Sequence, residues 1–348
     1  MQYRDALQTL ADHVVLSLAT AFPGHPVLGV INGRAGTAAR HHALLRTAAS
    51  LPRHPRVESW PEQSRSSVST VWTDSVEALH DVMNNWIERF DGDRGSRNHT
   101  PIIASFGGDG THNQVLRAVP AGRDGGVRDV WFFRVPLGSG NDAVGISSLP
   151  EVLGSISSRL VPVWIPEVEV QSPRRTLRAF NIASVGIDAF VTMMHHRLRV
   201  ALPGNTYRII ANLALLIYER LVKLGPISVV TDQEDLGTRE RVLIAFGVHG
   251  HLTYGDHIRI LPTEENLCLF DRVSLWGKIR MKRLLMEGNH VHEAITTMRR
   301  AGEMRLSYEG RLPVQVDGEA EWLEAEDFPL VMRTRERSRL VLQEPAPP

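Results

Sequence analysis

The feature of this sequence that most restricts its fold is a glycine-rich turn placed between a buried strand and a helix. The apolar run from Pro101 to Phe106 predicts the strand, the turn reads Gly107-Gly108-Asp109-Gly110-Thr111, and a helix is expected from His112 to Val119. Glycines let the backbone approach a ligand closely, and a helix N-terminus offers free N–H groups to an anion. The segment therefore predicts a phosphate-binding turn, with Asp109 as a candidate Mg²⁺ ligand. The competing interpretation is an ordinary turn that the aspartate stabilises.

Two further turns follow predicted strands in the same half of the chain. Pro136-Leu137-Gly138-Ser139-Gly140-Asn141-Asp142 follows the strand Val130–Val135, and Asn32-Gly33-Arg34-Ala35-Gly36 ends the strand Val27–Asn32. Turns at the carboxyl ends of parallel strands converge on one crevice, so the three turns together predict a nucleotide site. The GxxxxGK[ST] pattern of a Walker A site is absent, and Asn141 and Asp142 could instead cap the next helix.

The pattern of predicted elements changes near residue 160. Before it, strands alternate with helices such as Asp74–Phe90, which predicts a parallel α/β sheet. After it, short strands dominate, with helices expected at Lys278–Met286 and His290–Met298. We therefore divide the chain into an α/β domain at 1–160, a β-rich domain at 161–342 and a flexible tail at 343–348. Residues 1–25 would be an N-terminal extension whose helix lies peripheral to the core.

Composition limits the classes of partner and site. The formal net charge of the 348 residues is zero, so bulk electrostatic binding of nucleic acid is not expected. The only cysteine, Cys268, lies in an apolar run and is predicted to be a buried core residue, and no histidine pair has zinc-site spacing. The longest apolar candidate for a membrane span, Ile209–Tyr218, is about half the length needed. We expect a cytoplasmic protein without a transmembrane segment.

A basic and partly apolar segment gives a candidate for peripheral membrane contact. It reads Lys278-Ile279-Arg280-Met281-Lys282-Arg283. Each basic residue near an anionic lipid surface contributes on the order of 1 kcal/mol of attraction. The alternative is a solvated helix face.

Taken together, the motifs resemble the catalytic domain of diacylglycerol and sphingosine kinases. The turn at 107–111 is similar to their GGDGT signature, which NAD kinases and, more loosely, phosphofructokinases share. The segment at 136–142 is similar to the PLGTGND element. The other similar segments are Asn32–Gly36, Asn181–Ala189 (NIASVGIDA), Gly255–Pro262 and Val314–Glu319 (VQVDGE).

The resemblance implies an N-terminal α/β domain of the NAD-kinase and phosphofructokinase type, a C-terminal β-sandwich-like domain and an active site between them. The implied activity is transfer of the γ-phosphate of ATP to a lipid hydroxyl at a membrane surface. Asp109 would hold Mg²⁺, Asp317 would be the general base, and Glu319 would support the base or the metal. The residues expected to line the nucleotide site are Asn32, Thr73, Gly107, Gly108, Gly110, Thr111, Gly138, Ser139, Gly140 and Asn141.

The chain also departs from the family pattern, which keeps other functions open. Gln114 replaces an acidic residue, Val144-Gly145 stands where an arginine is usual, and Asn266-Leu267-Cys268 replaces Asp-Asp-Gly. Asp317-Gly318 alone would favour a simple hairpin turn. The alternatives are a kinase for a soluble substrate such as NAD and a catalytically inactive nucleotide- or lipid-binding homologue. The acceptor, diacylglycerol-like or sphingoid, and the oligomeric state, a homodimer included, stay open.

Overall fold

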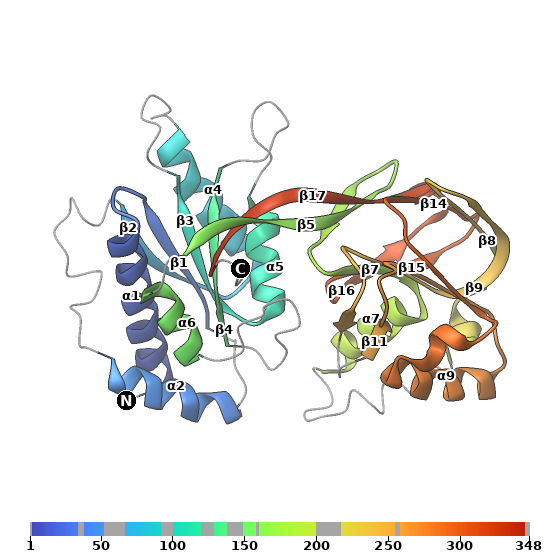
Figure 1. Ribbon diagram of the computed structural model, residues 1–348, viewed down its shortest axis with the longest axis horizontal. Helices are drawn as coiled ribbons and strands as arrows, with labels where there is room; N and C mark the ends of the chain where they lie inside the picture. The colour runs from blue at the N-terminus through green and yellow to red at the C-terminus, as the bar shows by residue number, and fades with distance from the viewer. Residues whose placement is uncertain are drawn as a thin grey trace. The chain divides into compact units, whose positions relative to one another are not determined.

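The chain forms two compact units (Figure 1). The first is Met1–Ile165 together with Arg337–Pro348, and the second is Pro166–Glu336. The chain enters the second unit within strand β5 (Val161–Gln171) and returns to the first within strand β17 (Leu330–Gln343). The computed structural model describes residues 2–33, 38–51, 67–91, 100–119, 129–137, 149–157, 160–199, 217–254 and 258–344.

The first unit is built on a parallel sheet in the strand order β17-β4-β3-β1-β2. The apolar runs that form β1, β3 and β4 are buried along nearly their whole length, as expected for strands covered on both faces. The central strands end level with one another, since Asn32 pairs with Thr73 and Gly107 pairs with Pro136. Their bounds are β1 (Val27–Asn32), β2 (Val68–Thr73), β3 (Ile102–Gly107) and β4 (Trp131–Pro136).

Helices cover both faces of this sheet (Figure 1). Alternate residues of β3, Ile102, Ala104 and Phe106, belong to the hydrophobic core that includes α1. Between them, Ser105 points to the opposite face, where its Oγ lies 2.7 Å from Nδ1 of His112 in α5. One layer is α1 (Tyr3–Ala21), α2 (Ala38–Ser50) and α6 (Leu149–Ser157), and the other is α4 (Val76–Asp91) and α5 (Asp109–Ala118).

The prediction that the first helix is peripheral is wrong. Apolar residues along α1, among them Leu7, Leu10 and Leu18, are fully buried in the core of the first unit. Gly29 explains how closely α1 approaches the sheet, because a Cβ there would lie 2.8 Å from Cγ2 of Val15. Polar residues of α1 hydrogen-bond to each other, since Gln8 Nε2 donates to Asp12 Oδ1 at 2.8 Å.

The second unit is mainly antiparallel. Its long strand β9 pairs with β8 along its first half and with β7 and β12 along its second half. Strand β15 pairs with β7 and with β16, and β14 pairs with β8. The strands are β6 (Thr176–Ala179), β7 (Ile182–Gly186), β8 (Pro226–Thr231), β9 (Asp235–Gly247), β10 (Leu252–Tyr254), β11 (Ile258–Leu261), β12 (Leu267–Asp271), β13 (Thr296–Arg299), β14 (Glu303–Ser307), β15 (Leu312–Val316) and β16 (Glu319–Leu323). The helices are α7 (Ile187–Arg199) and α9 (Leu275–Glu287), with 3₁₀ helices at Asn289–His292 and Ala325–Asp327.

The mixture of α/β and β-rich structure is confirmed, and one predicted element is wrong. The segment predicted as a helix from His290 to Met298 forms a 3₁₀ turn followed by β13, which pairs with β12. The apolar segment Ile209–Tyr218 lies almost wholly outside the described residues. No helix within the described ranges is both long enough and apolar enough to cross a membrane.

The single cysteine is placed as predicted. Cys268 has no exposed surface and lies in β12 within the core of the second unit. Burial raises the pKa of its thiol to about 12, because the interior disfavours the thiolate. Cys268 is therefore a packing residue.

Candidate functional site

The predicted phosphate-binding residues of the first unit gather at the carboxyl ends of neighbouring strands. Asn32, Thr73 and Gly107 are the last residues of β1, β2 and β3. A side-chain bond joins two of the turns, since Asn32 Nδ2 donates to Thr111 Oγ1 at 2.8 Å. The structure thus brings Asn32, Thr73 and the turn Gly107–Thr111 to one edge of the sheet.

Sterics explain the glycine at position 107. A Cβ at Gly107 would lie 2.4 Å from Cβ and from Oγ1 of Thr111, closer than real contacts permit. Thr111 can therefore fold back over the end of β3 only when residue 107 is glycine. Gly110 is different, because a Cβ there would meet no atom within 4 Å. Packing among the described residues therefore does not require glycine at position 110, and the missing side chain leaves open space beside the start of α5.

Helix α5 presents its N-terminus at this edge. Gly108 is the N-cap with extended backbone, φ −89° and ψ −177°, and no side chain caps the helix there. Asp109 is the first helical residue, where a negative charge is stabilised by the positive end of the helix dipole. Its side chain is partly exposed. The N–H groups of a first turn are suited to an anion.

A buried pair that the sequence analysis missed supports the start of α5. His112 and Ser105 are both about 2% exposed, and they are joined by the 2.7 Å contact across the sheet. Burial, with the positive charge of Arg134 nearby, lowers the pKa of His112 to about 3. The imidazole is therefore neutral at neutral pH and pins α5 to β3. No sequence signal distinguishes this histidine from an exposed one, because its partner lies on another element.

Several predicted residues cannot be placed. Gly138, Ser139, Gly140 and Asn141 lie outside the described residues, as does Val144-Gly145. The described end of that segment is Leu137, whose N–H donates to the carbonyl of Gly107 at 2.7 Å. The second glycine-rich turn therefore starts directly beside the first.

In the second unit, Asp317 and Gly318 form a two-residue hairpin turn. Val316 pairs with Glu319 across β15 and β16, and the residues between them have φ values of +48° and +84°. Positive φ at both central residues is the requirement of a type I′ turn, which Asp-Gly satisfies. The hairpin interpretation is therefore correct as a description of the backbone. Glu319 is exposed at the start of β16.

The carboxylate of Asp317 accepts three backbone hydrogen bonds. Phe180 N–H donates to Oδ2 at 2.7 Å, and the N–H groups of Asn181 and Ile182 donate to Oδ1 at 2.9 and 3.1 Å. The N–H of Asp317 donates in turn to the carbonyl of Ile182 at 3.0 Å. Hydrogen bonds to the charged form favour that form, so this turn docks an ionised carboxylate on the start of β7.

A network of buried polar side chains also holds the Asp317-Gly318 turn in place. Gln315 Oε1 accepts from the N–H of Gly318 at 2.7 Å. Gln315 Nε2 donates to Ser184 Oγ at 3.0 Å and to Asp188 Oδ2 at 3.2 Å, and Ser184 donates to Asp188 at 2.6 Å. The three side chains are at most 8% exposed. The sequence analysis missed them, although a glutamine inside the apolar run Leu312–Val316 was an available signal.

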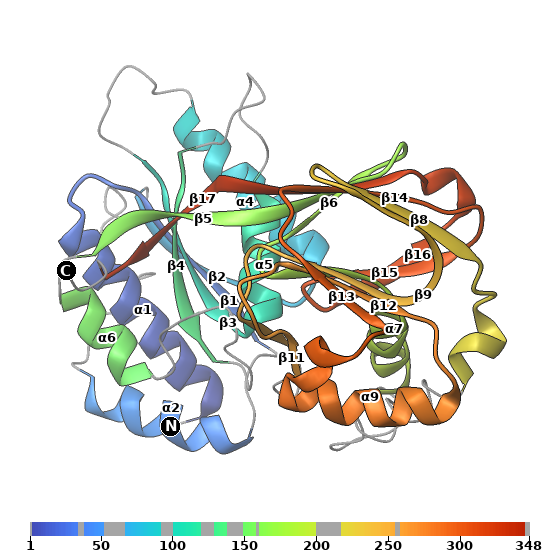
Figure 2. The same ribbon diagram turned by 45° about the vertical axis from the view of Figure 1, so that its right-hand side comes forward.

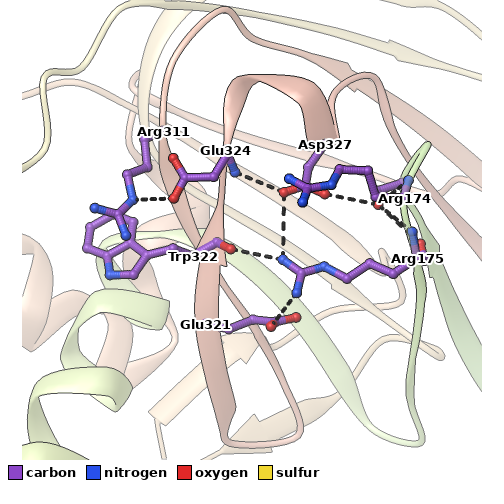
Figure 3. Close-up of polar contacts among 8 residues, drawn as sticks. Arg174, Arg175, Arg311, Glu321, Trp322, Glu324 and Asp327 are labelled. Carbon is purple, nitrogen blue, oxygen red and sulfur yellow. Dashed lines mark hydrogen bonds and ion pairs between the residues drawn. The ribbon is translucent and has the colours of Figure 1, made fainter.

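A second cluster of polar contacts holds β16 at Glu321 and Trp322 (Figure 3). Arg175 pairs with Glu321 at 2.7 Å and with the buried carboxylate of Asp327 at 3.6 Å, and it donates to the carbonyl of Trp322 at 2.9 Å. Arg311 covers the Trp322 ring, with its Cζ 4.1 Å from the ring centroid. Both ends of the hairpin that carries Asp317 are therefore anchored.

The fold of this chain is similar to that of known bacterial structures. Three of them come from Bacillus anthracis str. Sterne, and their TM-scores are 0.55, 0.52 and 0.56. The first and the third are named as candidate diacylglycerol kinases, and the second is named as a diacylglycerol kinase. Their sequence identities to this chain are 16%, 12% and 18%, and each comparison covers 92% of this chain and 98% of the other. The chain has the fold of these structures. No family model and no curated protein matches the sequence.

One departure from the family pattern has a structural explanation. Asn266, where the resemblance leads one to expect an acidic residue, is 6% exposed. Its amide donates to the carbonyls of Gly247 and Ala301 at 3.2 and 2.9 Å and accepts from the N–H of Ala301 at 2.9 Å. The side chain joins three segments of the second unit, a task that needs both a donor and an acceptor and that an ionised aspartate could not perform.

The histidine pairs do not form metal sites in the part of the chain that the structure describes. No group of three or more His, Cys, Asp or Glu side chains with metal-binding geometry occurs there. His251 pairs with Glu264 at 2.9 Å, and His290 is buried with Nε2 3.1 Å from the carbonyl of Ile260. His251 and His290 therefore have partners within the second unit.

Proposed function

We propose that this protein is an ATP-dependent lipid kinase that transfers the γ-phosphate of ATP to a lipid hydroxyl. The observation that carries the proposal is the turn Gly107–Thr111 at the end of β3, with the N-terminus of α5 and Asp109 beside it. Glycine-rich turns of this kind bind phosphates through backbone N–H groups. The likeness to structures named as diacylglycerol kinases supports a lipid as the acceptor.

The two units have separate tasks in this proposal. The first, related to the nucleotide-binding domain of NAD kinases and phosphofructokinases, binds ATP at its sheet edge through Asn32, Thr73 and the turn Gly107–Thr111. The second, a β-sandwich-like domain, presents the acceptor hydroxyl to Asp317. Gly138, Ser139, Gly140 and Asn141 complete the nucleotide site. The lipid is diacylglycerol-like or sphingoid.

The residues present fit a magnesium ion. Mg²⁺ is usually held by one or two protein carboxylates together with substrate phosphates, so a cluster of three acidic side chains is not required. Asp109 supplies one carboxylate beside a turn suited to phosphates, and Oδ1 of that carboxylate is buried. When bound, the ion would neutralise charge on the β- and γ-phosphates.

Asp317 is proposed to accept the proton of the acceptor hydroxyl. Its carboxylate is held in one position by the N–H groups of Phe180, Asn181 and Ile182, and a carboxylate oxygen has lone pairs for more than one donor. Phosphoryl transfer depends chiefly on positioning and on charge stabilisation, so a rigidly held acceptor of the hydroxyl hydrogen is sufficient. Glu319 supports this group or the metal.

The test is transfer of labelled phosphate from ATP and Mg²⁺ to a panel of acceptors. The panel holds micelles of diacylglycerol, monoacylglycerol, sphingosine, ceramide and phosphatidylglycerol, and soluble NAD. Asp109→Ala and Asp317→Asn are expected to lower transfer to a lipid by at least about a hundredfold. Asp81→Ala, an exposed carboxylate of α4, and Asp235→Asn, an exposed turn carboxylate, are the matched controls and are expected to keep full activity.

Each outcome separates one candidate from the others. Lipid phosphorylation that both variants lose supports the proposal and identifies the acceptor. Transfer to NAD alone would refute the lipid acceptor. ATP binding without transfer to any acceptor, by protein that is folded and otherwise stable, would favour the inactive nucleotide-binding homologue.

A further inference from the structure

Helix α9 carries an unusual concentration of exposed apolar side chains. Trp276 is 79% exposed, Ile279 is 47% exposed and Met286 is 41% exposed. Only six large apolar residues of the described chain are exposed, and half of them lie on this one helix. Positions 276, 279, 283 and 286 share one face at helical spacing, and α9 itself lies at the outside of the second unit (Figure 2). We refer to Trp276, Ile279, Arg280, Arg283 and Met286 as the α9 face.

The exposure is not the result of a loosely packed helix. On the inner side, Met281 is 4% exposed and Lys278 is 6% exposed, with its Nζ 2.5 Å from a carboxylate oxygen of Glu219. Ser274 caps the N-terminus by accepting from the N–H of Gly277 at 3.3 Å. Gly288, with φ +77°, closes the C-terminus. The helix is fixed from within, so its outer side chains are free to meet a partner.

Basic residues are interleaved with the apolar ones. The side chains of Arg280 and Arg283 are 68% and 77% exposed, and they follow Trp276 at four and seven residues. The acidic groups that face them are Glu293, 2.7 Å from Arg280, and Glu287, 3.6 Å from Arg283. Both ion pairs are solvent-exposed and therefore weak, so lipid phosphates can take the place of these carboxylates.

We propose that the α9 face docks the protein on the surface of a membrane that contains anionic lipids. Tryptophan prefers the boundary between headgroups and acyl chains, and a helix with an apolar face flanked by arginines lies in that boundary. Arg280 and Arg283 are exposed beside the apolar side chains, so their guanidinium groups can contact lipid phosphates while the apolar side chains enter the boundary. This arrangement favours an anionic phospholipid surface as the occupant, and a second copy of the chain is an outcome that the measurements below distinguish.

The inference deepens the proposed function, because a lipid kinase must reach an acceptor that lies in a membrane. It can nevertheless be tested without catalysis. The full-length protein is sedimented with vesicles of phosphatidylcholine alone and with vesicles that contain about one-third phosphatidylglycerol, in the absence of ATP. We expect binding to the anionic vesicles, and we expect it to weaken as salt is raised.

Substitutions on the α9 face identify the contact. Trp276→Ala with Ile279→Ser, and separately Arg280→Glu with Arg283→Glu, are expected to lower the vesicle partition coefficient by about tenfold or more. The matched controls lie on other elements of the second unit: Val230→Ser removes an apolar residue that is 40% exposed, and Arg239→Glu reverses an arginine that is 63% exposed and also ion-paired. Both controls are expected to bind as the wild type does. Circular dichroism checks that every variant is folded.

A spectroscopic measurement tests insertion directly. The chain has seven tryptophans, so the signal of Trp276 is taken as the difference between the wild type and Trp276→Phe. Brominated lipids are expected to quench that difference signal. Absence of binding to anionic vesicles, or equal binding by the α9 and control variants, would overturn the proposal. A monomer–dimer shift caused by Trp276→Ala without vesicle binding would also overturn it. Vesicle binding by a protein without kinase activity would leave the surface established and refute only the proposed reaction.

Discussion

Replacing Asp317 by asparagine should destabilise the second unit as well as reduce the proposed activity. Asparagine adopts positive φ about as readily as aspartate, so the backbone of the turn can be kept. The charge is lost, and an amide NH₂ group takes the place of one carboxylate oxygen. If Oδ1 keeps its bonds to Asn181 and Ile182, the new NH₂ group faces the N–H of Phe180, which donates to Oδ2 at 2.7 Å in the native turn.

The size of the effect follows from these three bonds. A hydrogen bond to a charged group contributes roughly 1.5–3 kcal/mol, against roughly 0.5–1.5 kcal/mol for a neutral pair. In Asp317→Asn the bonds from the N–H groups of Asn181 and Ile182 become neutral and therefore weaker. The bond from the Phe180 N–H is lost, because that donor then faces the donor NH₂ group of the asparagine. Asp317 is partly exposed, so water can satisfy some of these groups, and we reduce the sum accordingly. The expected loss is about 2–3 kcal/mol in the free energy of unfolding of the second unit.

Cys268 provides an assay for this unit alone. It is the only cysteine of the chain, and it is fully buried in the core of the second unit. A thiol reagent applied as a short pulse during urea denaturation therefore labels only molecules whose second unit has opened. Asp235→Asn, which neutralises an exposed carboxylate that accepts a single N–H bond of 2.8 Å, is the control and should change the unfolding free energy by less than about 0.5 kcal/mol. If Asp317→Asn is also within about 0.5 kcal/mol of the wild type, the hydrogen bonds assigned to this carboxylate do not stabilise the turn.

Three further predictions concern buried polar groups. Gln315→Leu removes the acceptor of the Gly318 N–H and a donor to Asp188, and should destabilise the second unit by about 2–4 kcal/mol in the Cys268 assay; a loss below about 1 kcal/mol would contradict the network. Asn266→Ala should cost about 2–3 kcal/mol in the same assay, because the N–H and C=O of Ala301 lose their partners; stability equal to the wild type would show that these groups are satisfied otherwise. The folded-state pKa of His112, about 3, lies below its usual 6.5, so the unfolded chain binds the proton first as pH falls. The contribution of neutral His112 to the free energy of unfolding should be fully present above pH 6.5 and should decrease by roughly 1.4 kcal/mol per pH unit between 6.5 and 3. In urea titrations followed by tryptophan fluorescence, His112→Gln should remove this contribution to the pH dependence of the unfolding free energy. An unchanged pH dependence in His112→Gln would assign it to other groups.

The sequence predicted those elements whose signals are local. The apolar run Val27–Asn32 coincides with β1, and the predicted strand before the glycine-rich turn is shifted by one residue from β3. The predicted helix Asp74–Phe90 corresponds to α4, and Ser75 caps it, since its Oγ accepts from the N–H of Ala78 at 3.1 Å. Strand runs, caps and glycine turns are encoded within a few residues, so a single chain suffices to find them.

The elements that the sequence did not predict depend on partners far along the chain. The β-rich domain was predicted to extend to residue 342, because nothing local indicates that β17 returns to pair with β4 of the first unit. The segment Thr296–Arg299 overlaps the predicted helix His290–Met298 and is nevertheless a strand, because its neighbour β12 supplies a ladder. The burial of α1 likewise depends on the sheet that it covers. Tertiary partners overrode local preference in these places.

Sequence reasoning found the residues at the turns but not the residues that hold the turns in place. Asp317 was visible as part of a motif, whereas its supports come from three elements, with Gln315 in β15, Ser184 in β7 and Asp188 in α7. Such networks are assembled only when distant segments pack together, so no spacing rule announces them. Ser105 and His112 are only seven residues apart, but their contact likewise forms only when α5 packs on β3.

Asp317 has a structural role in the hairpin turn and a proposed role as the general base. The two roles can be separated by comparing variants that destabilise the same turn in different ways. Gln315→Leu and Asp317→Asn should both destabilise the hairpin, but only the second removes the carboxylate. If Asp317 serves the turn alone, residual kinase activity should follow the loss of unfolding free energy along one line through both variants. If it also accepts the hydroxyl proton, Asp317→Asn should lie well below that line, by a factor of about a hundred at equal stability. Measuring both quantities on the same samples therefore separates a structural carboxylate from a catalytic one.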